Sequence, residues 1–463
     1  MAANPSIPTE LGTEKISRLL RQYALPAIIA QTASSLYNMV DSIFIGHGVG
    51  PQAISGLAVT FPLMNLSTAF GTLVGAGAAT MLSVLLGQKN YSAANKVLGN
   101  VVSLNIIIGL IFMALALIFI DPILIFFGAS EATLPYAKEY MTIILYGNII
   151  THLYFGLNAA MRSSGFPKKA MALTIFTVIF NTILDPIFIF VFDMGIAGAA
   201  WATVIAQAVA MCIVMHHFND KSRAFHFEKG IVRLDWRVAK DSLAIGMGPF
   251  LMNAAACLVT LFINQQLRKY SGDLGIGAYG ITNRFVFMFM MICMGLNQGM
   301  QPIAGYNYGA RQYSRVKDVF WKTAMLAMIV TTTCFIICCF FPKAAASIFT
   351  HDEQLLELSS ESLRMMTLVF PLVGFQMIGT NFFQSLGMVK KSIILSLSRQ
   401  ILFLLPLLYA MPMWLGTKGV WISFPIADLI AVSLTVILLM QLFRKFSRLK
   451  DGDDPSTLGS SIQ

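Results

Sequence analysis

Two carboxylates stand within long apolar segments of this 463-residue chain. Asp41 closes the apolar run Ile28–Ile45, and Asp185 lies inside the run Met171–Phe192. A charge placed in a bilayer is costly unless it faces a protein interior or a water-filled cavity, and such residues usually mark an ion or ligand path. These two acids are therefore the first candidates for chemistry.

Oxygen-bearing residues recur at a spacing of four around these acids. Asn181 and Asp185 share one helix face at that spacing. The same spacing recurs in two other apolar runs, in the pairs Tyr37–Asp41 and Ala199–Thr203. A small hard cation favours several oxygen ligands, carboxylates and carbonyls included. Two close carboxylates in a low dielectric can instead share a proton, and the sequence does not choose between the two.

The composition indicates an integral membrane protein. Hydrophobic residues make up 56% of the chain, charged residues only 12%, and the mean hydropathy is +0.71, whereas soluble domains average about 25% charged residues. Twelve apolar stretches could each cross a hydrocarbon core of ~30 Å. We expect an all-α polytopic fold with spans at Ser17–Phe44, Ala53–Leu86, Val97–Ile120, Tyr136–Ala160, Met171–Phe192, Ala197–His216, Ser242–Gln266, Ile276–Pro302, Val319–Phe341, Leu358–Phe383, Ser392–Met413 and Val420–Leu442.

The basic residues predict the orientation of these spans. Of the 32 lysines and arginines, 24 flank the same side of the predicted helices, which is the positive-inside asymmetry. We therefore expect a multi-pass protein of the cytoplasmic (inner) membrane with both termini cytoplasmic, and no nucleic-acid partner despite the net charge of +10. Met1–Lys15 shows no removable signal, so the first span should act as its own targeting signal.

The chain also repeats itself at an offset of 222 residues. Residues 87–92 resemble 309–314, residues 164–169 resemble 386–391, and Pro26 pairs with Pro249 at an offset of 223. Several weak matches at nearly one offset indicate a duplicated unit. Since each unit holds six spans, the two bundles are expected to be parallel repeats around a central cavity near the midplane.

These halves set the predicted domain boundaries. We expect an N-terminal six-helix bundle at 1–218, a basic cytoplasmic linker at 219–240, a C-terminal six-helix bundle at 241–446 and a disordered polar tail at 447–463, in a protein that works as a monomer.

Three motifs resemble one family of transporters. The pattern Tyr37-Asn-Met-Val-Asp41 behind Pro26, the run Asn181-Thr-Ile-Leu-Asp185-Pro186, and Gly198-Ala-Ala-Trp201-Ala-Thr203 are similar to those of the multidrug and toxic compound extrusion (MATE) family, in its DinF-like and MepA-like branches. The resemblance implies antiport, in which amphipathic and mainly cationic organic compounds or drugs leave the cell, conferring antibiotic resistance, as Na⁺ or H⁺ enters.

The resemblance also implies residue roles. The cation site, with Na⁺ as its candidate metal, would consist of Asp41, Asn181, Asp185, the Ala199 carbonyl and Thr203. We also expect a supporting network of Ser34, Tyr37, Asn38 and Asn158, in which Ser34 departs from the glutamine that some relatives carry at this position. Pro26 would hinge the first helix, since proline removes a backbone hydrogen bond. The repeat places Phe403, Leu407 and Phe424, or residues next to them, at the C-half counterparts of Asn181, Asp185 and Thr203, so a single N-half site is expected.

Other intramembrane residues are candidates for a substrate cavity. The set is Asn283, Arg284, Met288, Met291 and Asp428. Arg284 either faces the cavity or pairs with Asp428, and Arg399 is expected to extend toward the membrane surface. Methionine and phenylalanine adapt to varied ligand shapes, although ordinary packing explains the same residues.

Other function classes fit the sequence less well. A lipid-linked saccharide flippase of a related fold is the main alternative, but such proteins usually show more spans and a cavity lined by several arginines. No nucleophile elbow, metal-ligand cluster or phosphate-binding glycine loop indicates an enzyme, and no cofactor is expected. The six cysteines lie inside predicted spans as small apolar residues.

Overall fold

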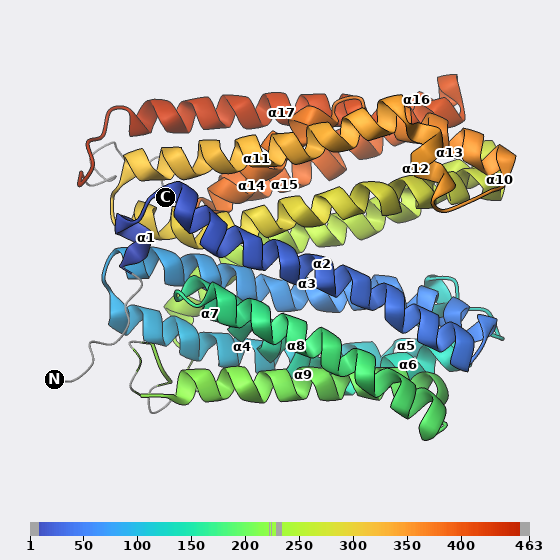
Figure 1. Ribbon diagram of the computed structural model, residues 1–463, viewed down its shortest axis with the longest axis horizontal. Helices are drawn as coiled ribbons and strands as arrows, with labels where there is room; N and C mark the ends of the chain where they lie inside the picture. The colour runs from blue at the N-terminus through green and yellow to red at the C-terminus, as the bar shows by residue number, and fades with distance from the viewer. Residues whose placement is uncertain (1–8, 222, 224, 228–233, 454–463) are drawn as a thin grey trace. The chain divides into compact units, whose positions relative to one another are not determined.

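The protein is helical throughout the region that the structure describes. The computed structural model describes residues 9–221, 223, 225–227 and 234–453, and the side chains of a few helix residues, Tyr37 and Asn38 among them, lie outside the description. Within these residues every regular element is a helix (Figure 1). The predicted all-α class is therefore confirmed.

The helices account for the twelve predicted spans. In the described residues nine helices are long and apolar enough to cross a membrane, and a tenth span is the pair Glu353–Met366 and Phe370–Ser385, bent by 57°. The remaining two predicted spans are a long first helix that carries several polar side chains, and a pair of helices interrupted at Gly147.

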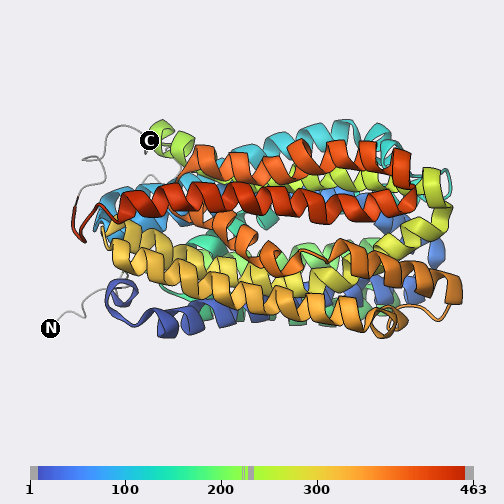
Figure 2. The same cartoon turned by 90° about the horizontal axis from the view of Figure 1, so that it is seen from above.

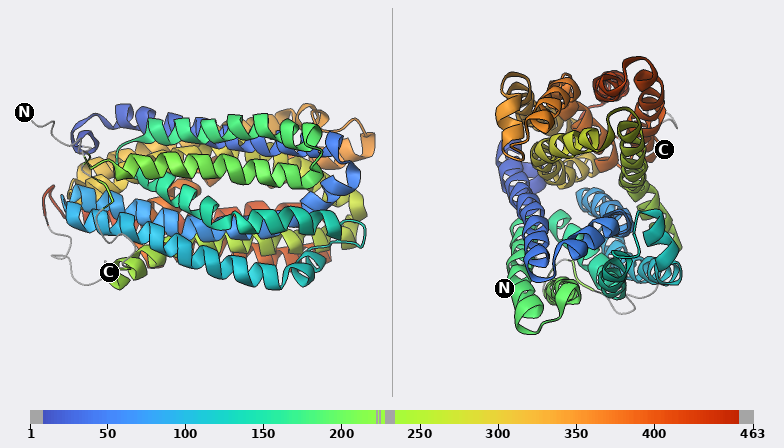
Figure 3. Two further views of the ribbon diagram at one scale, coloured as in Figure 1. Left: turned by 90° about the horizontal axis from the view of Figure 1, so that it is seen from below. Right: turned by 90° about the vertical axis from the view of Figure 1, so that its right-hand side faces the viewer.

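The chain divides into two compact units, each a bundle of long helices running alongside one another (Figures 2 and 3). Unit 1 comprises residues 1–13 and 29–250, and unit 2 comprises residues 14–28 and 251–463. The elements up to the end of the sixth span are α1 (Glu10–Thr13), α2 (Ile16–Gly48), α3 (Pro51–Gly87), α4 (Tyr91–Ile118), α5 (Ile120–Phe126), α6 (Leu134–Tyr146), α7 (Asn148–Ser163), α8 (Pro167–Pro186), the π-helix η1 (Ile187–Val191) and α9 (Gly195–Asn219).

The remaining elements form the second half of the sequence. They are α10 (Trp236–Gly309), α11 (Tyr313–Phe340), α12 (Pro342–Ser347), α13 (Glu353–Met366), α14 (Phe370–Ser385), α15 (Val389–Leu397), the π-helix η2 (Ser398–Leu404), α16 (Leu405–Leu415) and α17 (Thr417–Phe446). Gly272 has φ 62° and ψ −154° and interrupts α10, which therefore provides two spans, Trp236–Gly272 and Leu274–Gly309.

The backbone confirms the internal repeat. Helices α4 and α11 begin and end 222 residues apart, and so do α7 and α14. Lys89 and Arg311, also 222 apart, both adopt φ 58°, a conformation that non-glycine residues rarely adopt. Gly165 and Gly387 share a positive φ at the same offset. Turns, as well as helices, are therefore duplicated.

The compact units differ in one respect from the halves predicted from the sequence. The start of α2, up to Ile28, belongs to unit 2, and the start of α10, up to Phe250, belongs to unit 1. Each division falls close behind a proline inside a helix, Pro26 in one case and Pro249 in the other. The first helix of each half thus begins in the opposite unit, which no hydropathy pattern reveals.

Small residues allow these exchanged segments to pack closely. In unit 2, a methyl group on Gly295 would lie 2.5 Å from the Cα atom of Ile28, so α10 packs backbone against backbone on the start of α2. In unit 1, a methyl group on Gly77 of α3 would lie 1.9 Å from the Ser242 carbonyl oxygen at the start of α10. Small residues at such contacts allow close helix approach in membranes.

The end of the chain is ordered further than predicted. The Ser314 amide donates to Asp451 Oδ1 at 3.0 Å, the Tyr313 hydroxyl donates to the Asp453 carbonyl at 3.0 Å, and the Gly452 amide donates to the Arg311 carbonyl at 2.9 Å. The prediction of disorder is thus wrong for residues 447–453, while residues 454–463 and part of the predicted linker lie outside the described residues.

Candidate functional site

The two intramembrane carboxylates lie in unit 1 and act on each other. Asp41 of α2 is 5% exposed, and Asp185 of α8 is fully buried. An electrostatic interaction with Asp41 acts on Asp185, and such an interaction is strong in a medium of low dielectric. The expectation that the first and fifth spans bring their acids to one place agrees with this arrangement.

Two further helix positions complete a chain of polar contacts beside the acids. The Asn181 amide donates to the Thr203 hydroxyl at 3.2 Å, and that hydroxyl donates to the Ala199 carbonyl at 3.1 Å. All three residues are buried. The structure therefore places the predicted residues of α8 and α9 together with Asp185, as their spacing of four requires.

A tyrosine that sequence reasoning did not single out belongs to the same cluster. Tyr140 of α6 is 1% exposed, interacts electrostatically with Asp41 and Asp185, and forms a side-chain hydrogen bond with Thr203. The sequence held no usable signal for it, because Tyr140 follows no spacing shared with the other site residues. Its hydroxyl adds a proton donor to a group of acceptors.

Several oxygens of the cluster have no donor. The Oδ1 atoms of Asp41 and Asn181, and both carboxylate oxygens of Asp185, are buried without a hydrogen-bond partner among the described residues. Buried polar atoms in proteins are nearly always paired, and an unpaired buried carboxylate is especially costly. The residues of this site thus leave an unusual excess of acceptors.

The local helix geometry explains how α8 and α9 come together here. Pro186 follows Asp185 and lacks an amide hydrogen, and the chain continues as the π-helix η1. Single π turns often occur at functional sites. Gly198 allows α9 to approach, since a methyl group there would lie 2.9 Å from the Phe188 carbonyl. The neighbouring Ala199 thereby stays against the site.

The predicted supporting residues have mixed placements. Ser34 is half-buried on α2, whereas the side chains of Tyr37 and Asn38 lie outside the described part of the chain. Asn158 is buried and donates to the Ala170 carbonyl at 3.2 Å, about three helical turns from Asn181 on α8. The structure therefore does not bring Asn158 to the cluster but uses it to join α7 to α8. Pro26 lies inside α2 in unit 2, close to the division between the units.

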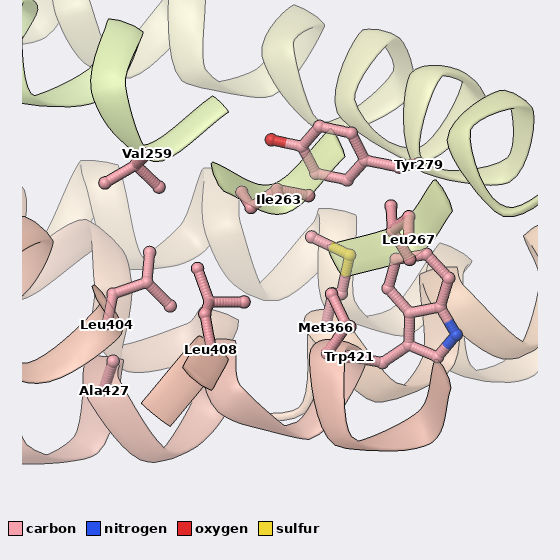
Figure 4. Close-up of a cluster of buried hydrophobic side chains, with 10 residues drawn as sticks. Val259, Ile263, Leu267, Tyr279, Met366, Leu404, Leu408, Trp421 and Ala427 are labelled. Carbon is pink, nitrogen blue, oxygen red and sulfur yellow. The ribbon is translucent and has the colours of Figure 1, made fainter. Parts of the chain in front are cut away.

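The C-half counterpart of the site is apolar, in agreement with a single N-half site. Phe403, Leu407 and Phe424 pack against a buried cluster that includes Ile263, Tyr279 and Trp421. Figure 4 shows buried members of this cluster, which come from α10, α13, η2, α16 and α17. Apolar side chains thus occupy the positions of unit 2 that correspond to the carboxylates and amides of unit 1.

The residues predicted to line a substrate cavity do not form one group. Asn283, Arg284 and Met288 of α10 are exposed, whereas Met291 is buried. Asp428 of α17 is buried and paired with Arg399 of η2 at 2.5 Å. The alternative of an Arg284–Asp428 pair is therefore wrong, because Asp428 pairs with Arg399 of the preceding span instead. The expectation that Arg399 extends to the membrane surface is also wrong, because its side chain turns to the buried Asp428.

Comparisons with known proteins identify relatives along nearly the whole chain. The MatE family model matches residues 26–187 and again 249–410, one match in each repeat. The multidrug export protein MepA of Staphylococcus aureus strain MRSA252 is 28% identical over 429 residues, which cover 93% of this chain and 94% of MepA. MepA of Staphylococcus haemolyticus is 27% identical over 427 residues, with 92% and 94% covered.

Solved structures agree with the sequence relatives. The MATE multidrug transporter DinF-BH, solved as a ligand complex, is 35% identical, has a TM-score of 0.88, and is covered completely by 96% of this chain. An outward-facing MATE transporter of the MOP superfamily has a TM-score of 0.90 at 21% identity, over 96% of this chain and 99% of that one, and shows the fold alone. The two matches of the family model, together with the DinF-BH likeness, show that this chain belongs to the MatE family and is a multi-pass membrane transporter for multidrug efflux, not an enzyme.

Proposed function

We propose that the protein exports small amphipathic organic cations in exchange for H⁺ or Na⁺ taken up at Asp41 and Asp185. The observation that supports this proposal is the group of buried carboxylate and amide oxygens without donors, on Asp41, Asn181 and Asp185. In an efflux transporter, a bound H⁺ or Na⁺ can satisfy these oxygens, and an ion gradient across the membrane supplies that ion.

The electrostatics of the site favour cation uptake. Burial disfavours the charged form of each acid, and the charge of Asp41 disfavours it further at Asp185. Neither acid interacts with a lysine or arginine in the described residues. Two unpaired carboxylates in a low dielectric repel each other, and a proton or a small cation relieves both the repulsion and the missing hydrogen bonds. The Ala199 carbonyl and Thr203 hydroxyl add oxygens suited to Na⁺.

Coupling follows from competition for these charges. While the acids are ionised, the site attracts a positively charged compound, and uptake of H⁺ or Na⁺ neutralises that attraction. The ion and the organic cation thus bind in turn, and exchange between the two membrane faces converts an inward ion gradient into outward export. Bending of α2 at Pro26 would transmit ion binding at Asp41 to the other end of that helix.

The decisive experiment measures export from proteoliposomes. A fluorescent cation, an ethyl-ester rhodamine dye, is followed while a pH gradient and a Na⁺ gradient are imposed separately. We expect one gradient to drive transport in the unchanged protein and Asp41→Asn or Asp185→Asn to abolish the dependence. Asp121→Asn is the matched control, since Asp121 is an exposed acid that pairs with Lys138 at 2.8 Å. Full gradient dependence in both site variants would refute the proposal.

The membrane location is proposed from charge. We place both termini on the cytoplasmic side of the cytoplasmic membrane, because the basic residues flank that side of the spans. Single cysteines introduced at Lys89 and at Lys138 should react with an impermeant reagent from opposite sides. We also propose that a single chain suffices, which is tested by transport from vesicles that hold one copy each.

A further inference from the structure

Unit 2 contains a buried ion pair that the proposed cation coupling does not use. The Nε atom of Arg399 donates to Asp428 Oδ1 at 2.5 Å. The Asp428 side chain is 4% exposed, whereas Arg399 keeps 23% of its side chain exposed. The accessible part of the pair is therefore mainly the arginine.

This pair lies deep within its two spans. Arg399 and Asp428 are each about ten residues from the nearest end of their helices, or about 15 Å along the axis. Ala427, the residue before Asp428, and Leu404, in the same π-helix as Arg399, belong to the buried apolar cluster of this unit (Figure 4). Tyr279 interacts electrostatically with Arg399. An arginine that is partly accessible at this depth requires water or an anion rather than lipid.

The fold does not require an ion pair at this position. The repeat places Thr177 at the counterpart of Arg399 by the offset of 222, and Gln207 at the counterpart of Asp428 by the offset of 221 that separates Gly198 from Gly419. Thr177 donates to the Leu173 carbonyl at 2.8 Å, and Gln207 pairs with Thr151, so neutral groups serve in the other half. Breaking a buried pair is costly, and apolar replacements often stabilise more than the pair itself. A role beyond packing therefore explains the charges better.

The backbone around Arg399 is also unusual. Arg399 lies in η2, and the other π-helix, η1, begins directly behind Asp185 and Pro186. Among the described residues these are the two π segments, and each half thus has one beside its buried charges. Because π turns are uncommon and often mark functional sites, η2 points to a second site in unit 2.

The remaining donors of Arg399 define what this site would bind. Its two terminal nitrogens make no hydrogen bond within the described residues, yet they are not enclosed. Guanidinium groups bind carboxylates through two parallel N–H donors. We propose that Arg399 binds the carboxylate of an amphipathic organic substrate, with Asp428 as the positioning residue that fixes the guanidinium.

This inference depends on the efflux function of the family and not on ion coupling, so it is tested by binding without a gradient. The probes are the same ethyl-ester rhodamine, which carries a fixed positive charge, and its free acid, which adds a carboxylate to the same dye. Fluorescence polarisation measures the affinity of each dye for the full-length protein in lipid nanodiscs.

Only one of the two single variants is expected to weaken binding of the free acid. Arg399→Gln should weaken binding of the free acid roughly tenfold or more, as expected for lost charge-assisted hydrogen bonds, and should leave binding of the ester within about twofold. Asp428→Asn keeps an acceptor for Nε but removes a competing carboxylate, so the acid should bind equally or more tightly. Arg364→Gln is the control, because Arg364 is an exposed arginine that donates to the Cys339 carbonyl.

A purely structural pair would give a different result. Both single variants would then change the two dyes in parallel, and that outcome overturns the proposal. If Arg399→Gln does not fold, the double variant Arg399→Gln/Asp428→Asn removes both charges while keeping similar volumes. Selective loss of the acid in the double variant supports carboxylate binding, and equal affinities of the double variant and the unchanged protein for the acid refute it.

Discussion

Replacing Gly295 by alanine tests the close packing between α10 and the start of α2. A methyl group at this position would lie 2.5 Å from the Ile28 Cα atom and 2.6 Å from its amide nitrogen. Carbon atoms in contact prefer about 3.5–4.0 Å, so the two helices would have to separate by roughly 1 Å. Such overpacking costs about 1–3 kcal/mol.

Gly280 provides the matched control within the same span. It is also helical, and a methyl group there meets nothing within 4 Å. Alanine stabilises a helix by about 0.5–1 kcal/mol relative to glycine, and this gain is shared by both variants. Gly295→Ala should therefore be less stable than Gly280→Ala by about 1–3 kcal/mol, the overpacking cost alone.

The assay is thermal unfolding of the purified protein in detergent, followed by intrinsic fluorescence. Because the obstacle is backbone, adding Ile28→Ala should not rescue Gly295→Ala. Equal melting temperatures for the two glycine variants, or full rescue by Ile28→Ala, would show that the segment does not pack on α10 as described. Transport by Gly295→Ala should also fall, since the strained contact lies beside Pro26.

Three other predictions follow from the same structure. Pro26→Ala and Pro249→Ala should each restore a helical hydrogen bond, raise the melting temperature of the protein and slow export. Export at the normal rate in both variants would exclude a hinge role for these prolines. Burial tends to raise the pKa of Asp451, but hydrogen bonds from Ser314 outweigh it and hold the pKa below its usual range. The contact of Asp451 with α11 should therefore persist at neutral pH and be lost only in acid, as the pH falls through this lowered pKa. Limited proteolysis over a series of pH values measures the loss as cleavage of the tail. Thr203→Val removes the hydroxyl that joins Asn181 and Ala199 and should weaken ion-dependent transport several-fold with folding intact, as measured in proteoliposomes.

Much of the fold could be predicted because membranes constrain the chain strongly. Backbone groups must be paired within each span, so long apolar runs read directly as helices. The repeat followed from short motifs, and the positive φ of Lys89 and Arg311 shows why these motifs persist at both turns. A pattern of hydropathy, however, has no information about which unit a helix end packs against, and the exchanged starts of α2 and α10 were therefore missed.

The site was predictable where its residues share a helix. Asn181 with Asp185, and Ala199 with Thr203, follow from spacing alone. Tyr140 and the Arg399–Asp428 pair depend on contacts between different helices, and a buried tyrosine or arginine has several candidate partners in sequence. A simple rule would have favoured the correct pair: spans joined by a short turn pack as neighbours, and α16 is separated from α17 only by Gly416.

The two halves share one backbone arrangement but differ in how their buried acids are paired. In unit 1 the acids Asp41 and Asp185 have no cationic partner among the described residues, so their charge can be neutralised by an ion that binds reversibly. In unit 2 the single buried acid of the described residues, Asp428, is held by Arg399, and hydrophobic side chains occupy the counterpart of the ion site. A fixed pair cannot exchange ions without a large cost. In the proposed mechanism the ion is therefore taken up in unit 1, whereas the proposed recognition of a charged substrate in unit 2 relies on the donors of Arg399 that Asp428 does not engage.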